Sequence, residues 1–388
     1  MHLHDTEEDR AFRLRVRAWL AANQPTEPRP LDGPESVSYD LAWQRRQHEA
    51  GWAGIAWPRE HGGLGLSLTR QLIWHEEYAR ADAPQIGNLF VAVNHAGPTL
   101  VLRGTEEQKA FHLPRILRGE AVWCQGFSEP GAGSDLAGIR TRGVVDGDHL
   151  VVTGQKIWTS FAQHARYQEL LVRTDPAAPR HKGLTWVICD MQLPGITVRP
   201  ILSMAGEYHC NEVFYDAVRI PLANVVGRIN DGWSVAMCTL GLERGQSFIA
   251  RQIALEFRMR KLVALARVTP GPLGGSMLDD GALAERLARL QAEVAALKAT
   301  TYVAVSTAEH GAAPGPEGAM IALQYSELAQ RVMRTAMDVL GPAGLVLESH
   351  DDWNWEFLNS FKYTITGGTA EIRRNIIAEQ VLGLPKSS

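Results

Sequence analysis

A glycine-rich loop over residues 129–138 is the stretch of this sequence whose residue types and spacing could do chemistry. It follows a short run that alternates like a β-strand, and its glycines let the backbone approach a ligand closely. A dinucleotide-binding GxGxxG turn is the first alternative, because Gly131 and Gly133 have the opening spacing. However, Leu136 replaces the third glycine, and the polar and β-branched residues 139–153 do not predict the helix that such a turn needs. The loop therefore predicts either a different kind of ligand site or a glycine-rich turn without a ligand.

The composition predicts a globular protein and excludes some classes of partner. The chain has 388 residues, of which 45% are hydrophobic and 21% are charged. A formal net charge of −4 gives no general reason to expect nucleic acid or an anionic membrane as a partner. The acidic N-terminus lacks the apolar segment of a secretory signal, and no stretch is apolar for long enough to span a bilayer. We therefore expect a cytoplasmic protein.

Cysteine and histidine spacings give no support to a metal site. The sequence has no CxxC and no Cys/His ligand spacing, and its cysteines are far apart, at Cys124, Cys189, Cys210 and Cys238. This pattern favours free thiols in a reducing compartment. His75 is followed by two Glu residues but lacks the second His of a zinc protease helix, so we interpret it as structural.

Residues 1–120 predict an N-terminal helical domain. Apolar residues recur at helical spacing between about residues 5 and 22, among Arg and Glu. A proline-rich linker is expected over residues 25–34, and further helices over residues 41–50 and 68–81.

Residues 121–230 predict a middle β domain. Short β-rich runs are separated by Gly, Pro and Asp turns and cover residues 149–154, 167–172, 184–189 and 211–216. Their intervals suit an antiparallel barrel or sandwich rather than βαβ units.

Residues 231–388 predict a C-terminal helical bundle. A stripe of apolar residues at spacings of four and three defines one helix face: Leu283, Leu287, Leu290, Val294 and Leu297. Further helices are expected over residues 317–340 and 369–382, and a Gly- and Pro-rich loop over residues 269–281. The fold class that follows is α+β and multidomain.

Two segments of the middle region carry a resemblance to a known family. Residues 128–135, Ser-Glu-Pro-Gly-Ala-Gly-Ser-Asp, resemble the first signature of the acyl-CoA dehydrogenase family, whose loop lies between flavin and thioester. Residues 154–160, Gly-Gln-Lys-Ile-Trp-Thr-Ser, resemble the strand of that family in which a Trp packs on the flavin ring. The order of helical, β and helical regions is similar to the family architecture over the whole chain. The resemblance implies FAD as the cofactor and, typically, a tetramer with flavin at a dimer interface.

The resemblance also implies roles for individual residues. Ser128 corresponds to a hydroxyl that hydrogen-bonds the flavin ring, Trp158 to the packing Trp, and Ser160 to the hydroxyl at flavin N5. A Trp in a β domain is more often a core residue, but the adjacent first signature favours the flavin role. Ser134 corresponds to a position that contacts CoA. The implied cofactor-binding set is Gln125, Phe127, Ser128, Gly133, Ser134, Trp158, Thr159, Ser160, Gly341, Thr369 and Glu371.

Two C-terminal segments resemble the remaining family motifs. Residues 341–344 occupy the place of the second, glycine-rich signature, which is degenerate here because Asp338 and Pro342 stand where Gln and Gly are usual. Residues 367–374 resemble the final motif, a turn into a helix N-terminus whose amides suit an anion or a carbonyl oxygen. Gly368 of that turn is implied to bind substrate.

The catalytic base departs from the commonest family pattern. In that pattern a Glu immediately precedes the Gly-Thr of the final motif, and here that position is Gly367. Members that resemble isovaleryl- and long-chain acyl-CoA dehydrogenases carry the base on a bundle helix, directly before an Arg. Glu243 and Arg244 match that pair, so the resemblance implies Glu243 as the base, with its pKa raised by burial, and Arg244 as a CoA-binding residue. A solvated charge pair is the alternative interpretation.

A second departure concerns the adenine half of the cofactor. The family's Arg-x-Gln-Phe-Gly segment, whose Arg reaches the flavin pyrophosphate of a neighbouring subunit, is absent. Arg251, Arg258 and Arg260 lie in the region, but none of them is in that motif. The sequence therefore leaves open which Arg, if any, binds the pyrophosphate.

The leading hypothesis is an FAD-dependent acyl-CoA dehydrogenase that forms a 2,3-enoyl-CoA and passes its electrons to an electron-transfer flavoprotein. The departures resemble bacterial members of fatty acid or steroid side-chain catabolism that act on bulky, branched or steroid-derived acyl groups. Some of those are heterotetramers, so either a homotetramer or a heterotetramer with a related subunit is implied. A non-catalytic or partly competent subunit is one alternative, and it should be colourless when purified alone. A flavin oxidase or monooxygenase on the same fold is another, and it should consume oxygen.

Overall fold

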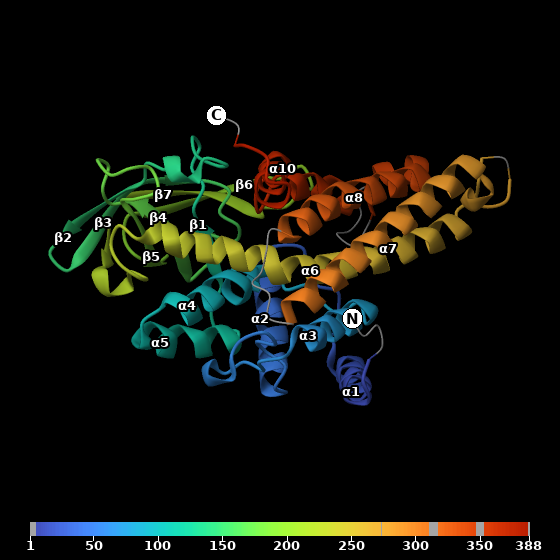
Figure 1. Cartoon of the computed structure of the whole chain (residues 1–388), viewed down its shortest axis with the longest axis horizontal. Coiled ribbons are helices and arrows are strands. Elements are labelled where there is room, and N and C mark those ends of the chain that lie inside the picture. The colour runs from blue at the N-terminus through green and yellow to red at the C-terminus, as the bar shows by residue number, and fades with distance from the viewer. Residues whose placement is uncertain (1–4, 273, 310–316, 347–352, 387–388) are drawn as a thin grey trace. The chain divides into compact units, whose positions relative to one another are not determined.

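The computed structural model describes residues 5–272, 274–309, 317–346 and 353–386, without the side chains of residues 243–248 and 317. The chain divides into two compact units that are described separately below. The β unit contains residues 24–66 and 84–243, and the bundle unit contains residues 1–23, 67–83 and 244–388. Helix α6 (Gly232–Val268) contributes to both units (Figure 1).

A curled sheet of seven strands forms the centre of the β unit. The strands are β1 (Trp123–Gly126), β2 (Arg142–Asp146), β3 (His149–Lys156), β4 (Tyr167–Arg173), β5 (Leu184–Asp190), β6 (Ile196–Ile201) and β7 (Cys210–Pro221). Their order is β1-β4-β2-β3-β7-β6, with β5 paired to β4. Most pairings are antiparallel, as the sequence predicts, but β1 and β2 both pair with β4 in parallel. The long connection from β1 to β4 lets the chain return in the same direction, which a hairpin cannot do.

Alternation along β4 produces two buried faces. Leu170 and Val172 pack in one apolar cluster with β3, β5 and β7. Tyr167 and Leu171 pack in another cluster, together with the helical segments that precede the sheet. A strand with both faces buried is expected to be apolar throughout, so the fully buried Gln168 and Glu169, which lie on opposite faces of β4, are exceptions in this strand.

Helices of the β unit are α2 (Gly33–Glu49), α4 (Gly97–Arg103) and α5 (Glu106–Leu117), with a π-helical turn, η3 (Ala92–Ala96), directly before α4. The predicted linker was wrong at its end, because α2 begins at Gly33 rather than near residue 41. Asp32 caps that helix by accepting a hydrogen bond from the Gly33 backbone N–H at 2.7 Å. Pro34 lies in the first turn, where a missing backbone N–H costs no helical hydrogen bond.

The bundle unit consists of helices from both ends of the chain. It contains α1 (Glu7–Asn23), α3 (Leu68–Arg80), the second part of α6, α7 (Gly281–Glu309), α8 (Glu317–Leu340), α9 (Trp353–Ser360) and α10 (Ala370–Ile376). The predicted α7 stripe is confirmed, since all five residues from Leu283 to Leu297 are buried in the bundle core. In the part of the chain that the structure describes, no helix is long and apolar enough to cross a membrane.

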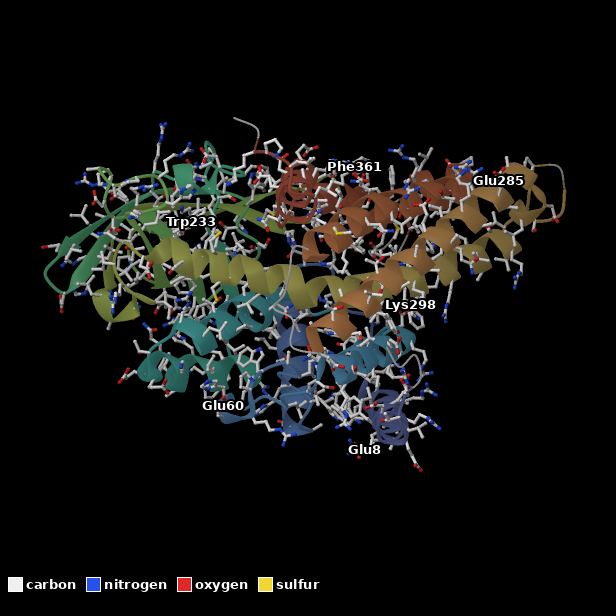
Figure 2. All side chains as sticks on the ribbon, in the orientation of Figure 1. Glu8, Glu60, Trp233, Glu285, Lys298 and Phe361 are labelled. Carbon is white, nitrogen blue, oxygen red and sulfur yellow. The ribbon has the colours of Figure 1, made fainter. Side chains whose placement is uncertain are left out.

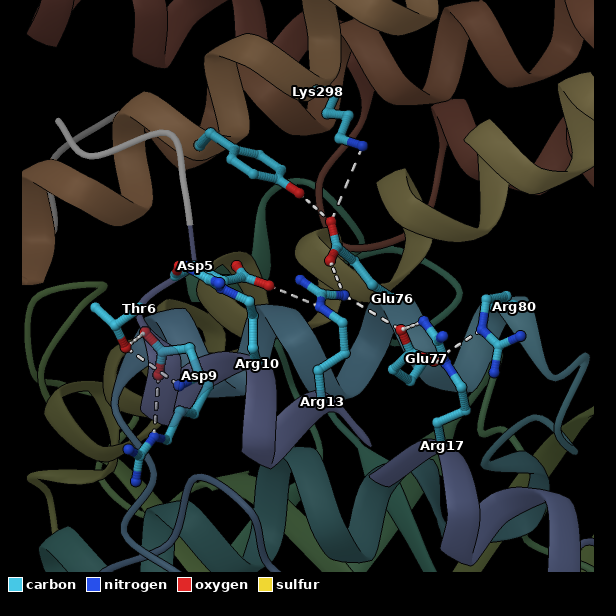
Figure 3. Close-up of polar contacts among 12 residues, drawn as sticks. Asp5, Thr6, Asp9, Arg10, Arg13, Arg17, Glu76, Glu77, Arg80 and Lys298 are labelled. Carbon is cyan, nitrogen blue, oxygen red and sulfur yellow. Dashed lines mark hydrogen bonds and ion pairs between the residues drawn. The ribbon is translucent and has the colours of Figure 1, made fainter. Parts of the chain in front are cut away.

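A cluster of charged residues joins α1 and α3 inside the bundle unit (Figure 3). The Glu77 carboxylate, 2% exposed, accepts hydrogen bonds from Arg17 at 2.8 and 2.9 Å, Arg80 at 2.7 Å and Arg13 at 3.3 Å. Glu76 accepts from Arg13 at 2.7 Å and from the Tyr302 hydroxyl of α7. Burial raises the pKa of Glu77, but the guanidinium groups of Arg17, Arg80 and Arg13 lower it by more, to about 2.

We expect Glu77→Gln to destabilise the protein in a pH-dependent way. The pKa of Glu77 is lower in the folded chain than the ordinary value of 4.5, so its stabilisation is complete above pH 4.5 and is lost as pH falls toward about 2. The variant should lose about 2 to 4 kcal/mol of unfolding free energy at pH 7. Urea denaturation of both proteins should show that this difference narrows between pH 5 and pH 3.

A matched control for that experiment is Glu285→Gln. The Glu285 side chain lies on α7 at 63% exposure and pairs with Arg289 one turn along (Figure 2). An exposed pair of this kind contributes less than about 1 kcal/mol. A Glu77→Gln deficit as small as that of the control, or one that stays constant with pH, would contradict the account.

Candidate active site

The glycine-rich loop leaves β1 through a tight turn. The backbone N–H of Glu129 donates to the Ala132 carbonyl, and the N–H of Ala132 donates back to the Glu129 carbonyl, each at 3.0 Å. Ser128 is partly exposed at the start of this turn, whereas Gly133 and Ser134 are exposed beyond it. The loop therefore has a fixed base and an open outer part.

The two segments singled out in the sequence lie side by side. The backbone N–H of Ile157 donates to the Ser128 carbonyl at 2.9 Å, directly after β3 ends at Lys156. This hydrogen bond connects Ser128, on the first segment, to the residues immediately before Trp158 and Ser160, on the second. Three of the residues predicted to contact one cofactor ring thus belong to adjacent pieces of chain.

A buried ion pair, which the sequence reasoning missed, fixes this arrangement. The Lys156 ammonium, 0% exposed, lies 2.8 Å from the Glu129 carboxylate and donates to the Phe127 carbonyl at 2.9 Å. Glu129 also accepts from the backbone N–H groups of Arg140 at 2.6 Å and Thr141 at 2.8 Å. Two side chains therefore hold the end of β1, the loop, the segment before β2 and the end of β3.

Both members of this pair keep their charge at neutral pH. Burial lowers the pKa of Lys156 to about 8, although Glu129 opposes that shift. Burial raises the pKa of Glu129, but Lys156 and the two N–H donors lower it by more. Both residues stand inside the quoted segments, yet nothing in their local sequence indicates that they pair.

Trp158 has the properties of a wall for a planar ligand. Its side chain is 61% exposed, and its backbone φ is +60°, a left-handed conformation that is costly for a bulky residue. Its neighbour Thr159 is fully buried and is clamped to Asn211, with backbone N–H and C=O hydrogen bonds of 3.0 Å each. A large apolar ring that a strained, anchored backbone holds outside the core is accessible for packing against a planar ligand.

Other predicted residues of the β unit have more limited roles. Phe127 and Thr159 have buried side chains, so a contact with a cofactor would come from their backbones. The Thr159 hydroxyl has no hydrogen-bond partner among the described residues. The Ser160 hydroxyl is partly exposed and lies 4.0 Å from the Cys210 sulfur. Gln125 is partly exposed on β1.

The bundle unit holds the predicted C-terminal residues. Gly367 and Gly368 have φ values of +67° and +97°, and Thr369 caps α10 by accepting from the Ile372 N–H at 3.2 Å. Glu371 is exposed on α10, and Gly341 is exposed at the start of a 3₁₀ turn, η7 (Gly341–Leu345). The predicted turn into a helix N-terminus is thus present at residues 367–370.

Glu243 and Arg244 lie within α6, but their side chains are outside the described part of the structure. They stand at the boundary between the two units. The proposed base is therefore placed on a helix, as the sequence predicts, and its role stays a prediction.

Comparison with known proteins gives the family. Three family models match successive parts of the chain: the acyl-CoA dehydrogenase N-terminal domain at residues 6–120, the middle domain at residues 124–218 and the C-terminal domain at residues 230–382. The chain is 40% identical to acyl-CoA dehydrogenase IpdE1 of Mycobacterium tuberculosis, with 100% of both chains covered. This chain belongs to the acyl-CoA dehydrogenase family. It is therefore an oxidoreductase, and the resemblance found in the sequence is confirmed.

Solved structures show the same acyl-CoA dehydrogenase fold. A structure described as Tcur3481-Tcur3483 steroid ACAD matches with a TM-score of 0.86 and 32% identity, and covers 100% of both chains. The ChsE4-ChsE5 complex from Mycobacterium tuberculosis matches with a TM-score of 0.85 and 33% identity, again over 100% of both chains. The predicted α+β architecture with a middle β region is thus confirmed, whereas the predicted domain boundaries and individual site residues stay predictions.

Proposed function

We propose that this acyl-CoA dehydrogenase is FAD-dependent and converts an acyl-CoA thioester to its 2,3-enoyl-CoA. The observation that carries the proposal is the junction of the two segments, where Ser128 is hydrogen-bonded to Ile157 beside the exposed, strained Trp158. A partly exposed hydroxyl beside an exposed indole suits a flat ring system with polar edges.

In this proposal the chain's residues hold and prepare the reactants. Ser128, Trp158 and Ser160 orient the flavin ring, and the backbone of Gln125, Phe127, Gly133 and Thr159 contributes to the same site. When bound, FAD supplies the acceptor for the hydride that leaves the substrate β-carbon. Glu243 accepts the α-proton as general base. Ser134, Arg244 and Gly368 bind the CoA thioester, and Gly341, Thr369 and Glu371 contribute to cofactor binding.

The buried ion pair at the base of the loop also supports the assignment of FAD as the cofactor. The Lys156–Glu129 pair fixes the ends of β1 and β3, so Ser128 and Trp158 are held in place before any ligand binds. Preorganised groups of this kind lose little conformational entropy on binding. The rigid base and exposed outer loop suit a cofactor held against the sheet and a substrate reached from outside.

Substrate class and partners follow from the named relatives. The two solved structures compared above are described as a steroid ACAD and as a complex of two differently named chains. We propose a steroid-derived or similarly bulky acyl group as substrate, and a heterotetramer with a related subunit, or a homotetramer, as the assembly. An electron-transfer flavoprotein is the proposed electron acceptor.

The test is the visible spectrum of the purified chain before and after anaerobic addition of a panel of straight, branched and steroid-derived acyl-CoAs. We expect a yellow protein whose flavin absorbance bleaches with at least one bulky acyl-CoA. A colourless protein that becomes yellow and active only with a second chain would support a partly competent subunit instead. Oxygen consumption coupled to substrate loss would favour an oxidase and contradict the proposal.

A further inference from the structure

Arg173, the last residue of β4, is bound to the end of the glycine-rich loop through its guanidinium group. The side chain is partly buried and donates hydrogen bonds to the backbone carbonyls of Ala137 at 2.5 Å and Ile139 at 3.5 Å. Ser134, which we propose as a CoA contact, is exposed three residues before Ala137. The end of β4 therefore fixes the chain that directly follows the exposed part of the loop.

The same guanidinium group holds a second loop, residues 174–183, which connects β4 to β5 and is called the β4–β5 loop below. Both of its terminal nitrogens donate to the Arg180 carbonyl at 3.2 Å, and one of them donates to the Lys182 carbonyl at 2.8 Å. The His181 ring packs against Trp233 at the start of α6, at a centroid distance of 4.7 Å. An arginine presents five donors in a planar fork, so it can bind carbonyls of two loops at once, which a lysine ammonium cannot do. One side chain therefore sets the spacing of the two loops.

Three exposed cationic residues stand at the carbonyls that Arg173 holds. Arg180 and Lys182 carry two of these carbonyls, and Arg140 directly follows the residue that carries another. We call these three residues the basic rim. Asp135 pairs with Arg180, but both side chains are more than half exposed, so the pair is screened by water and contributes little. Cations gathered in one region of the surface repel one another and favour a ligand with several negative charges.

We propose that Arg173 is a positioning residue for substrate binding, which holds the two loops so that the basic rim binds the phosphate groups of CoA. This inference rests on the proposed function, in which Ser134 contacts CoA. CoA joins the pantetheine arm, which carries the acyl thioester, to a nucleotide that carries the phosphate groups. The rim therefore acts far from the reacting carbons. A contact that is equally strong in the ground state and in the transition state lowers KM and leaves kcat unchanged.

The test compares one acyl-CoA with the same acyl group on pantetheine, which keeps the thioester but lacks the nucleotide. In Arg173→Lys the positive charge stays, but the ammonium no longer holds both loops. With the purified flavoprotein and an artificial electron acceptor, we expect this variant to raise the KM for acyl-CoA about tenfold, with kcat within about twofold. The KM for acyl-pantetheine should stay unchanged. A purely structural role predicts instead that both substrates are affected equally, together with a fall in kcat or in flavin content.

The matched control is the same substitution at the other end of the strand. Arg166 directly precedes β4, is 39% exposed and forms an ion pair with Asp190 at 2.7 Å. Arg166→Lys keeps the charge of this pair, and it touches neither the glycine-rich loop nor the β4–β5 loop in the contacts given above. It should therefore leave the KM values for acyl-CoA and for acyl-pantetheine within about twofold of the wild type.

A second variant tests the basic rim without turnover and decides the question even if Arg173→Lys does not fold. Arg180→Gln combined with Lys182→Gln removes two exposed charges but keeps the backbone carbonyls that Arg173 binds. We expect this double variant to bind free CoA about tenfold more weakly by isothermal titration calorimetry, with a smaller salt dependence of Kd than in the wild type.

Two failures are distinguishable. Equal changes in KM for acyl-CoA and acyl-pantetheine in Arg173→Lys, or a wild-type Kd for CoA in the double variant, would overturn this inference and leave the proposed function intact. If no acyl-CoA bleaches the wild-type flavin, the proposed function falls, and this inference falls with it.

Discussion

Glu243→Gln should bind flavin like the wild type but lose at least about 10³-fold in the rate of acyl-CoA-dependent bleaching. The amide has nearly the shape of the carboxylate but cannot accept the α-proton. Because Gly367 occupies the position of the base in the commonest family pattern, no second carboxylate stands there to take over. The measurement is an anaerobic stopped-flow record of flavin absorbance with saturating acyl-CoA.

The matched control for that variant lies on the same helix. Glu256 of α6 is 17% exposed and forms an ion pair with Lys298 at 2.9 Å in the bundle unit. Glu256→Gln should bleach at a rate within about twofold of the wild type, because its pair contributes to packing alone. Rapid bleaching of Glu243→Gln, or an equal loss in both variants, would show that the base is another residue.

Lys156→Met should strongly lower the free energy of unfolding, because it breaks a buried ion pair of the β unit. It leaves the Glu129 carboxylate buried without its ammonium and removes the donor to the Phe127 carbonyl. Breaking a buried ion pair in this way costs about 3–5 kcal/mol. We expect a matching fall in the free energy of unfolding, measured in urea, and a large fall in FAD content because Ser128 and Trp158 lose their shared support.

A double variant tests whether the pair itself carries this effect. Lys156→Met combined with Glu129→Gln removes the uncompensated charge and should recover part of the stability that the single variant loses. Lys109→Met is the control, since Lys109 pairs with Glu106, which is 83% exposed, and should cost less than about 1 kcal/mol. Strict additivity of the two substitutions, or a single variant as stable as the control, would contradict a coupled buried pair.

Local sequence patterns predicted most of the helices and strands, because the spacing of apolar residues along a short segment reflects the element that the segment forms. The spacing of Leu283 to Leu297 defined one helix face, and α7 buries that face. The short β-rich runs of residues 149–216 lie within strands of the sheet. The start of α2 was missed because proline was interpreted as a breaker, whereas Pro34 lies in the first turn, where it is tolerated. The parallel pairing of β1 depends on the return of a distant strand, and no local pattern predicts it.

The candidate site was predictable only in part, because the residues that support it are far apart in the sequence. The residues with exposed or partly exposed groups, Ser128, Trp158 and Ser160, stand in recognisable segments. The residues that hold them are not recognisable in this way, because Lys156 and Glu129 pair across 27 positions of the sequence. A buried charge is costly without a partner, but the local sequence around Lys156 or Glu129 does not indicate which residue that partner is.

The central claim, flavin-dependent α,β-dehydrogenation, is tested most directly by the product of one anaerobic turnover. The wild-type flavoprotein is mixed with a limiting amount of the acyl-CoA that bleaches it, and the recovered CoA thioester is identified by mass spectrometry. The account predicts one 2,3-enoyl-CoA, lighter than the substrate by two hydrogens, for each flavin bleached. Recovery of unchanged thioester, or formation of an oxygenated product only when air is admitted, would contradict it.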